Sequence, residues 1–154
     1  MIDLIHPKGV IANLRVTSKK QALQEMTRRA AELTGQSERQ IFDVLLERER
    51  LGTTGVGHGV AIPHGKLPHL NRLYGGFARL CHPIDFESID ERPVDLIFLL
   101  LVPELAEANH WNLEALAHVS RLVQNKGLCD KLRHTDRGDV LYALLTASYT
   151  HQAA

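Results

Sequence analysis

The chain has 154 residues, with 18 Lys and Arg balanced by 18 Asp and Glu. This length suits one compact domain, and the neutral balance argues against nucleic acid or an anionic membrane surface as a partner. The longest apolar run, residues 96–102, is much shorter than the ~20 residues of a membrane-spanning helix, and no secretion signal precedes it. Two isolated cysteines, Cys81 and Cys129, favour reduced thiols. We therefore expect a soluble, cytoplasmic protein without membrane insertion.

Two helices are predicted in the first third of the chain. Ser18 and Gln21 form a capping box, and apolar residues then recur at helical spacing as far as Gly35, a common helix stop. The same start signal returns at Ser37, and the helical spacing continues to Arg48.

Strands are predicted in the middle of the chain. Residues 59–63 and 74–80 are short runs bounded by turn residues. Residues 96–102 do not alternate between apolar and polar side chains, and Pro93 and Pro103 bracket them. A continuous apolar run of this length is typical of a central strand that is covered on both faces.

Helical spacing returns in the last third, over residues 113–123, and ends near Gly127. A short helical piece at 129–133 follows, and Asp136 is expected to cap a last helix. Helices and strands are thus interleaved, and helices must cover both faces of the central strand. The pattern predicts a single α/β domain, with a mixed β-sheet sandwiched between helices.

Residues 52–66 hold five of the eleven glycines and include His64, which lies between Pro63 and Gly65. Such a glycine density indicates unusual dihedral angles or close backbone approach. Pro63 fixes its own φ and keeps the preceding residue extended, which restricts the directions that His64 can take. Free backbone N–H groups beside a nucleophilic side chain suit a phosphoryl group.

Spacing excludes other common sites for phosphate or metal. A dinucleotide fingerprint would need glycine where Val60 stands, and the glycines of a P-loop would lie one residue too far apart. His58, His64 and His69 lack the i, i+4 spacing that sets two imidazoles on one helical face. No metal and no other cofactor is predicted, and a metal-dependent hydrolase lacks its ligands.

The remaining chemistry is nucleophilic catalysis by His64, whose neutral imidazole can attack a phosphoryl donor in line. Backbone N–H groups and hydroxyls of the glycine-rich run would bind the phosphoryl oxygens; the candidates are Thr53, Thr54, Gly55, Gly57 and Gly65. The guanidinium of Arg48 would add positive charge through a bidentate contact with the phosphoryl oxygens. Spacing alone favours a solvated helix end for Arg48, because it lies in the charge run 47–50.

The segment 48–66 has a recognisable sequence pattern, Arg48-Glu49-x-x-Gly-Thr-Thr-Gly-Val-Gly-x-Gly-Val-Ala-Ile-Pro-His64-Gly-Lys66. It closely resembles the active-site signature of enzyme IIA proteins of the bacterial phosphoenolpyruvate-dependent phosphotransferase system. The match is to the fructose/mannitol superfamily, and most closely to its nitrogen-regulatory branch. The resemblance extends to residues 83–96, to Leu-Val-Pro at 101–103, and to Leu-Cys-x-x-Leu-Arg at 128–133.

This resemblance implies that His64 accepts a phosphoryl group from a small histidine-phosphocarrier protein, as a tele-phosphohistidine. It places Arg48 at the family's active-site arginine, which reverses the preference from spacing. The implied fold is the mannitol-type IIA fold, a mixed sheet of about five strands, in one type-2 EIIA domain over residues 1–154. The protein would then belong to the transferase class as a stoichiometric phosphocarrier.

One position departs from the family pattern. A second active-site histidine usually opens the helix after the Val-Pro strand end, in an H-L-x-x-L pattern. In register with Leu113 and Leu116, that position is Asn112, and His110 lies two residues earlier. Either His110 or Asn112 is the expected second group, and His58 is expected to be a bystander.

Two functions follow from the resemblance. The first is a regulatory phosphocarrier of the nitrogen-type system, whose phosphorylation state changes which target proteins it binds. The alternative is a sugar-specific, fructose/mannitol-type IIA component that passes the phosphoryl group to a IIB domain for sugar uptake. The chain carries no fused IIB-like or membrane segment, which favours the first.

Overall fold

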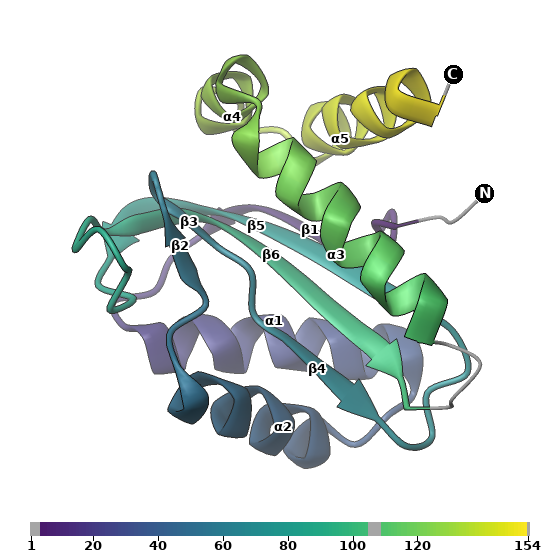
Figure 1. The fold of residues 1–154 in the computed structure, drawn as a ribbon. Coiled ribbons are helices and arrows are strands. Elements are labelled where there is room, and N and C mark those ends of the chain that lie inside the picture. The colour runs from purple at the N-terminus through teal and green to yellow at the C-terminus, as the bar shows by residue number, and fades with distance from the viewer. Residues whose placement is uncertain (1–3, 105–108, 154) are drawn as a thin grey trace.

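The computed structural model describes the backbone of residues 4–104 and 109–153, and the side chains of residues 4–104 and 113–147. Within these ranges six strands form one mixed sheet, and helices lie on both of its faces (Figure 1). This confirms the predicted single α/β domain with a mixed sheet of about five strands.

Helices α1 (Lys19–Thr34) and α2 (Glu38–Leu51) cover one face of the sheet (Figure 1). Both begin as predicted. The hydroxyl of Ser18 accepts the N–H of the third residue after it at 3.2 Å, and Ser37 does the same for α2. Gly35 ends α1 with a φ of 74°, a conformation that side chains disfavour.

The sheet has the order β1-β5-β6-β3-β2, and β4 pairs with β6 beyond the end of β3. The strands are β1 (Val10–Leu14), β2 (Gly55–Gly57), β3 (Val60–Ala61), β4 (His64–Leu67), β5 (Tyr74–Ile84) and β6 (Val94–Pro103). β5 runs antiparallel to β6, and β2 antiparallel to β3; the other pairs are parallel. The sequence patterns predicted β3, β5 and β6, but not β1, β2 and β4.

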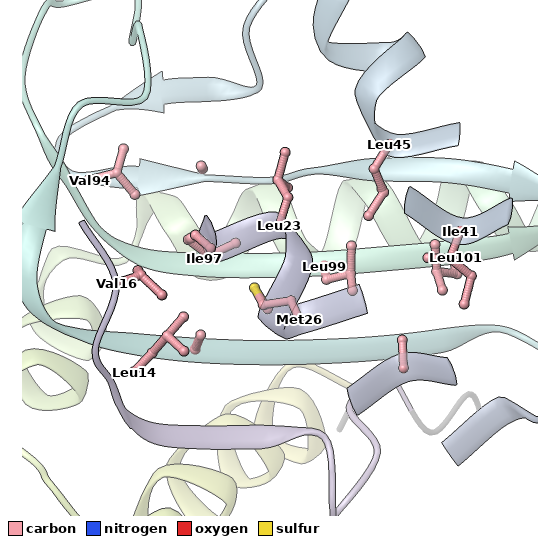
Figure 2. Packing of buried hydrophobic residues seen from close by; sticks show 14 of the residues in the cluster. Leu14, Val16, Leu23, Met26, Ile41, Leu45, Val94, Ile97, Leu99 and Leu101 are labelled. Carbon is pink, nitrogen blue, oxygen red and sulfur yellow. The ribbon is translucent and has the colours of Figure 1, made fainter. Parts of the chain in front are cut away.

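The apolar run in β6 is a central strand covered on both faces, as its sequence predicts. Its side chains alternate between two hydrophobic clusters. Ile97, Leu99 and Leu101 pack towards α1 and α2 with Leu23, Met26, Ile41 and Leu45 (Figure 2). Leu96, Phe98 and Leu100 pack into the second cluster, with Val119, Leu122, Leu132 and Leu141.

Helices α3 (Asn109–Gln124), α4 (Lys126–Arg133) and α5 (Gly138–Ala153) cover this second face (Figure 1). Two predicted boundaries are wrong. Asn125 caps α4, so that α3 ends before Gly127. The N–H of Leu141 donates to the carbonyl of Arg137, which puts Arg137 and not Asp136 at the cap position of α5. None of the described helices is long and apolar enough to cross a membrane.

Candidate phosphoryl-acceptor site

His64 is the first residue of β4, directly after the proline that separates β3 from β4. Both strands run beside β6, where Val60 pairs with Leu96 and His64 with Leu100. Pro63 has no N–H to donate, but its carbonyl accepts the N–H of Leu100 at 3.0 Å. The half-buried His64 is therefore held at a fixed register on the central strand.

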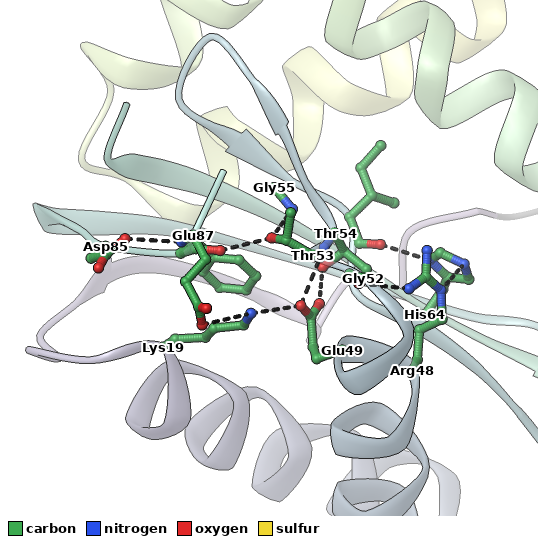
Figure 3. A network of polar contacts seen from close by, with 12 residues as sticks. Lys19, Arg48, Glu49, Gly52, Thr53, Thr54, Gly55, His64, Asp85 and Glu87 are labelled. Carbon is green, nitrogen blue, oxygen red and sulfur yellow. Dashed lines mark hydrogen bonds and ion pairs between the residues drawn. The ribbon is translucent and has the colours of Figure 1, made fainter. Parts of the chain in front are cut away.

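Two contacts hold the His64 ring (Figure 3). Its Nδ1 lies 2.8 Å from the carbonyl oxygen of Ile62, and Nε of Arg48 donates to its Nε2 at 3.3 Å. A carbonyl oxygen can only accept, so Nδ1 must carry the proton, and a guanidinium can only donate, so Nε2 must offer a lone pair. The contacts thus select the neutral tautomer whose nucleophilic atom is Nε2.

Arg48 lies in the last turn of α2, and its guanidinium joins the helix end to the His64 ring. Nη1 donates to the carbonyl of Gly52 at 2.8 Å, which fixes the plane of the fork. Among the described residues, Nη2 has no hydrogen-bond partner. The guanidinium can therefore turn its Nε and Nη2 donors to an oxyanion bound at Nε2 of His64.

A buried carboxylate beside Arg48 holds the loop that precedes β2 (Figure 3). The side chain of Glu49 is 6% exposed and pairs with Lys19 of α1 at 2.7 Å. It also accepts the N–H of Thr54 at 3.2 Å and the hydroxyl of Thr54. The ammonium of Lys19 lies 4.9 Å from the centre of the Phe86 ring. Sequence reasoning missed the roles of Lys19 and Glu49; the pair joins residues thirty positions apart, so no local pattern indicates it.

The hydroxyls of Thr53 and Thr54, proposed from sequence as phosphate ligands, are engaged within this loop. Thr53 Oγ1 donates to the carbonyl of Phe86 at 2.7 Å and accepts the N–H of Gly55 at 3.0 Å. Thr54 Oγ1 donates to Glu49, as described above. In this structure both hydroxyls hold the loop against its neighbours and do not contact His64.

Three glycines of the run allow close backbone packing. A Cβ on Gly55 would collide with Ser88, and one on Gly65 would collide with Val44 of α2. Gly57 faces Asp90 and pairs with Val60, four residues along the ladder from His64, which is about 13 Å at ~3.3 Å per residue. The structure thus brings Arg48 to the His64 ring, places Gly65 next to His64 in the lining of one pocket, and leaves Gly57 apart from the ring.

The second predicted group lies where side chains are outside the described part of the chain. His110 and Asn112 both fall in the first turn of α3. That helix does approach the site, because Leu113 and Leu116 line a pocket of about 340 Å³ together with His64. His110 and Asn112 therefore remain alternatives at this position.

Among the described residues, no group of three or more His, Cys, Asp or Glu side chains could hold a metal ion.

The carboxyl of Asp90, near the β2–β3 turn, accepts the N–H groups of His58 and Arg92, which lower its pKa from the ordinary value. His58 itself does not contact His64 in the described structure.

Comparison with known proteins places this site in a family. Residues 3–148 match the family described as "Phosphoenolpyruvate-dependent sugar phosphotransferase system, EIIA 2". A nitrogen regulatory protein from Bradyrhizobium diazoefficiens is 57% identical over 143 residues, which cover 93% of this chain and 92% of that protein.

Solved structures agree. The nitrogen regulatory protein IIA-Ntr from Neisseria meningitidis has a TM-score of 0.85 and 33% identity, covering 93% of this chain and 97% of that one. IIA mannitol from Escherichia coli shares the fold at 17% identity, with a TM-score of 0.73 over 91% of this chain and 97% of that one. The histidine on the central sheet and its arginine thus lie in a chain that belongs to the EIIA 2 family of the phosphoenolpyruvate-dependent phosphotransferase system.

Proposed function

We propose that this chain is a regulatory phosphocarrier of the nitrogen-type phosphotransferase system, and that it works in the cytoplasm. His64 accepts a phosphoryl group on Nε2 from a histidine-phosphocarrier protein. The phosphorylation state then decides which target proteins the chain binds.

The observation that carries this proposal is the pair of contacts on the His64 ring. The Ile62 carbonyl occupies Nδ1, so that Nε2 alone is available for bond formation. The cation of Arg48 lies 3.3 Å from that atom, where negative charge on a transferred phosphoryl group needs stabilisation.

The transfer step balances without a further reactant. The lone pair of His64 Nε2 forms a bond to phosphorus while the P–N bond of the donor's phosphohistidine breaks, and its electron pair returns to the donor's imidazole. Arg48 leaves Nε2 and donates from Nε and Nη2 to the phosphoryl oxygens, while Nη1 stays near Gly52. The Nδ1 proton of His64 stays on the ring throughout.

The surface around the site is suited to a protein donor. Leu51, at the end of α2, is 81% exposed, and Leu113 of α3 is 71% exposed. Leu113 also borders the pocket beside His64. Exposed leucines on two elements that meet at the nucleophile offer apolar contact area to a docking partner.

The names of relatives favour regulation over sugar uptake. Both the Bradyrhizobium protein and the Neisseria structure are named as nitrogen regulatory proteins. A phosphoryl group adds a charge of about −2 next to exposed leucines, which is enough to create or abolish a protein interface. The regulatory targets are proteins whose binding to this chain depends on the added charge.

The test is transfer of label from [³²P]phosphoenolpyruvate through purified enzyme I and a nitrogen-type phosphocarrier protein. We expect acid-labile, base-stable label on the chain, and none on His64→Ala. Arg48→Lys keeps a charge but loses the fork, and we expect it to slow labelling roughly 10²-fold. His69→Ala, an exposed histidine that follows β4, is the matched control and should label at the normal rate.

Parallel assays of His110→Ala and Asn112→Ala identify the second group, because only the variant at the contacting position should slow labelling. Label that persists on His64→Ala would exclude this acceptor. Labelling through a sugar-type carrier alone, followed by transfer to a IIB domain, would show that the chain is a transport component and not a regulator.

A further inference from the structure

A second cavity lies between the β2–β3 hairpin and helices α3 and α4, and the proposed phosphocarrier function does not use it. Its volume is about 650 Å³, within the range of small-molecule sites. Figure 1 shows the hairpin projecting towards α4 on the second face of the sheet.

The walls of this hairpin cavity are mainly apolar. Val56 and Ile62 line it from the hairpin side, and Val123 lines it from α3. Cys129, which is 3% exposed, also lines the cavity. Burial raises the pKa of its thiol, so this part of the lining stays uncharged at neutral pH. Such walls suit the hydrocarbon part of a ligand.

The rim of the cavity is cationic in a chain whose overall formal charge is zero. Arg92, Lys126 and Arg133 line it together with the carboxylate of Asp130, and Asp95 pairs with Arg133 at 3.0 Å, which leaves a surplus of one positive charge. Lys126 forms no ion pair within the described part of the chain. Arg92 reaches Asp90 only at 4.0 Å, and its side chain is 70% exposed. Two cations are thus available to a ligand.

Arg133 fixes the hairpin wall in place. Its Nε contacts both oxygens of Asp95 at 3.0 Å, and its Nη2 donates to the carbonyl of His58 at 2.6 Å. The turn at His58 and Gly59 has φ values of 57° and 80°, and a Cβ on Gly59 would approach Arg133 Nη2 to 2.6 Å. The cavity is therefore preformed, which lowers the entropic cost of binding.

We propose that the hairpin cavity binds a small amphiphilic anion, an apolar body that carries a carboxylate, phosphate or sulfonate group. Lys126 and Arg92 contact the anionic group at the rim. Val56, Ile62 and Val123 cover the apolar body. The ligand rests on Ile62, the same residue whose carbonyl orients the His64 ring.

The probe for this site is 1-anilinonaphthalene-8-sulfonate, which joins an apolar ring system to one sulfonate and fluoresces when shielded from water. We expect saturable binding at one site on the folded chain. Lys126→Glu should weaken that binding at least tenfold. Lys131→Glu makes the same charge change at another exposed position of α4 that does not line the cavity, and should change affinity less than twofold.

A variant that fills the cavity and NMR mapping of the ligand contacts complete the test. Val56 is 42% exposed, so Val56→Trp can occupy the cavity mouth without burying a new group, and it should abolish binding. Methyl resonances of Ile62 and Val123 should shift on titration. Circular dichroism of each variant verifies the fold.

Three results would overturn the proposal. The first is an absence of saturable fluorescence on the folded chain. The second is equal weakening by Lys126→Glu and Lys131→Glu, which would show a bulk charge effect. The third is binding that survives Val56→Trp but disappears in Leu113→Ser, which would move the probe to the pocket beside His64.

Discussion

Glu49 is the least exposed carboxylate among the ion pairs of the described structure, and it joins three segments of the chain. Its 6% exposed side chain pairs with Lys19 of α1 and accepts two hydrogen bonds from Thr54. The pair is partly removed from water, since Lys19 is 18% exposed. Loss of one partner from such a pair leaves an uncompensated charge, and this costs more than the pair itself contributes.

We expect Glu49→Ala to lower the free energy of unfolding by about 3 kcal/mol, because the polar groups of Thr54 lose their partner and Lys19 keeps only the exposed carboxylate of Glu87, at 3.6 Å. Urea denaturation followed by circular dichroism measures this. Glu47→Ala, two residues earlier in α2, removes a carboxylate that is 65% exposed and, among the described residues, forms an ion pair with Arg50 alone. It should cost less than ~0.5 kcal/mol, and equal losses in both variants would contradict a structural role for Glu49.

At the scale of elements, the contact between α2 and β4 decides whether the two site residues meet. α2 carries Arg48 and β4 begins with His64. The space that a Cβ would need at Gly65 is filled by a methyl group of Val44. Glycine at this position lets the helix approach the strand closely enough for Arg48 to donate to His64 at 3.3 Å.

Gly65→Ala should therefore push α2 from β4 and lower the free energy of unfolding by about 1–3 kcal/mol. Val44 is stiff at χ1 and cannot easily turn its methyl group aside. The double variant Gly65→Ala, Val44→Ala restores the room and should be more stable than Gly65→Ala alone. Urea denaturation of the four members of this double-mutant cycle measures the coupling.

Gly127→Ala is the matched control, because a Cβ there meets only the Asn125 side chain at 3.6 Å. It should leave stability unchanged or raise it by up to ~1 kcal/mol. If the double variant were as unstable as Gly65→Ala, the loss would come from the backbone of β4 and not from contact with α2.

Local patterns account for the elements that sequence predicted well. Ser18 and Ser37 are caps in the structure, and the run at 96–102 is the buried central strand. β2, β3 and β4 have two to four residues each, and Pro63 interrupts the edge that they form. Such strands are defined by their pairing partners, β3 for β2 and β6 for β3 and β4, and not by their own periodicity, which is why β2 and β4 were missed.

The candidate site could likewise be predicted only in part from the sequence. His64 could be identified from its own segment, because glycines and proline mark it locally. The bond from Arg48 to His64 depends on the packing of α2 on β4, and the pair of Lys19 with Glu49 joins residues thirty positions apart. Contacts of this kind are set by tertiary packing, so spacing along the chain could not reveal them.

On the scale of the whole molecule, β6 is shared by two hydrophobic clusters. Leu99 belongs to the cluster with α1 and α2, whereas Phe98 belongs to the cluster with α3, α4 and α5. Both side chains are nearly inaccessible, at 1% and 0% exposed. Because one strand supplies both clusters, neither cluster can lose its order while the other keeps an intact sheet.

We therefore expect Leu99→Ala and Phe98→Ala each to cost about 2–5 kcal/mol and to unfold in one cooperative transition. Hydrogen exchange in α1 and α5 should accelerate in both variants, whichever cluster contains the substituted side chain. Leu51→Ala, at a position that is 81% exposed, is the control and should leave both measurements nearly unchanged. Two separate transitions would show that the clusters are independent folding units.

The bond between the His64 Nδ1 proton and the Ile62 carbonyl has a consequence for the reversibility of the proposed transfer. A ring that keeps this proton while Nε2 holds a phosphoryl group departs as a neutral imidazole when the P–N bond breaks. Without the proton, the leaving group would be the far more basic imidazolate. The carbonyl of Ile62 thus keeps the phosphoryl transfer reversible, because the ring that it holds protonated at Nδ1 can both attack phosphorus and leave it as a neutral imidazole.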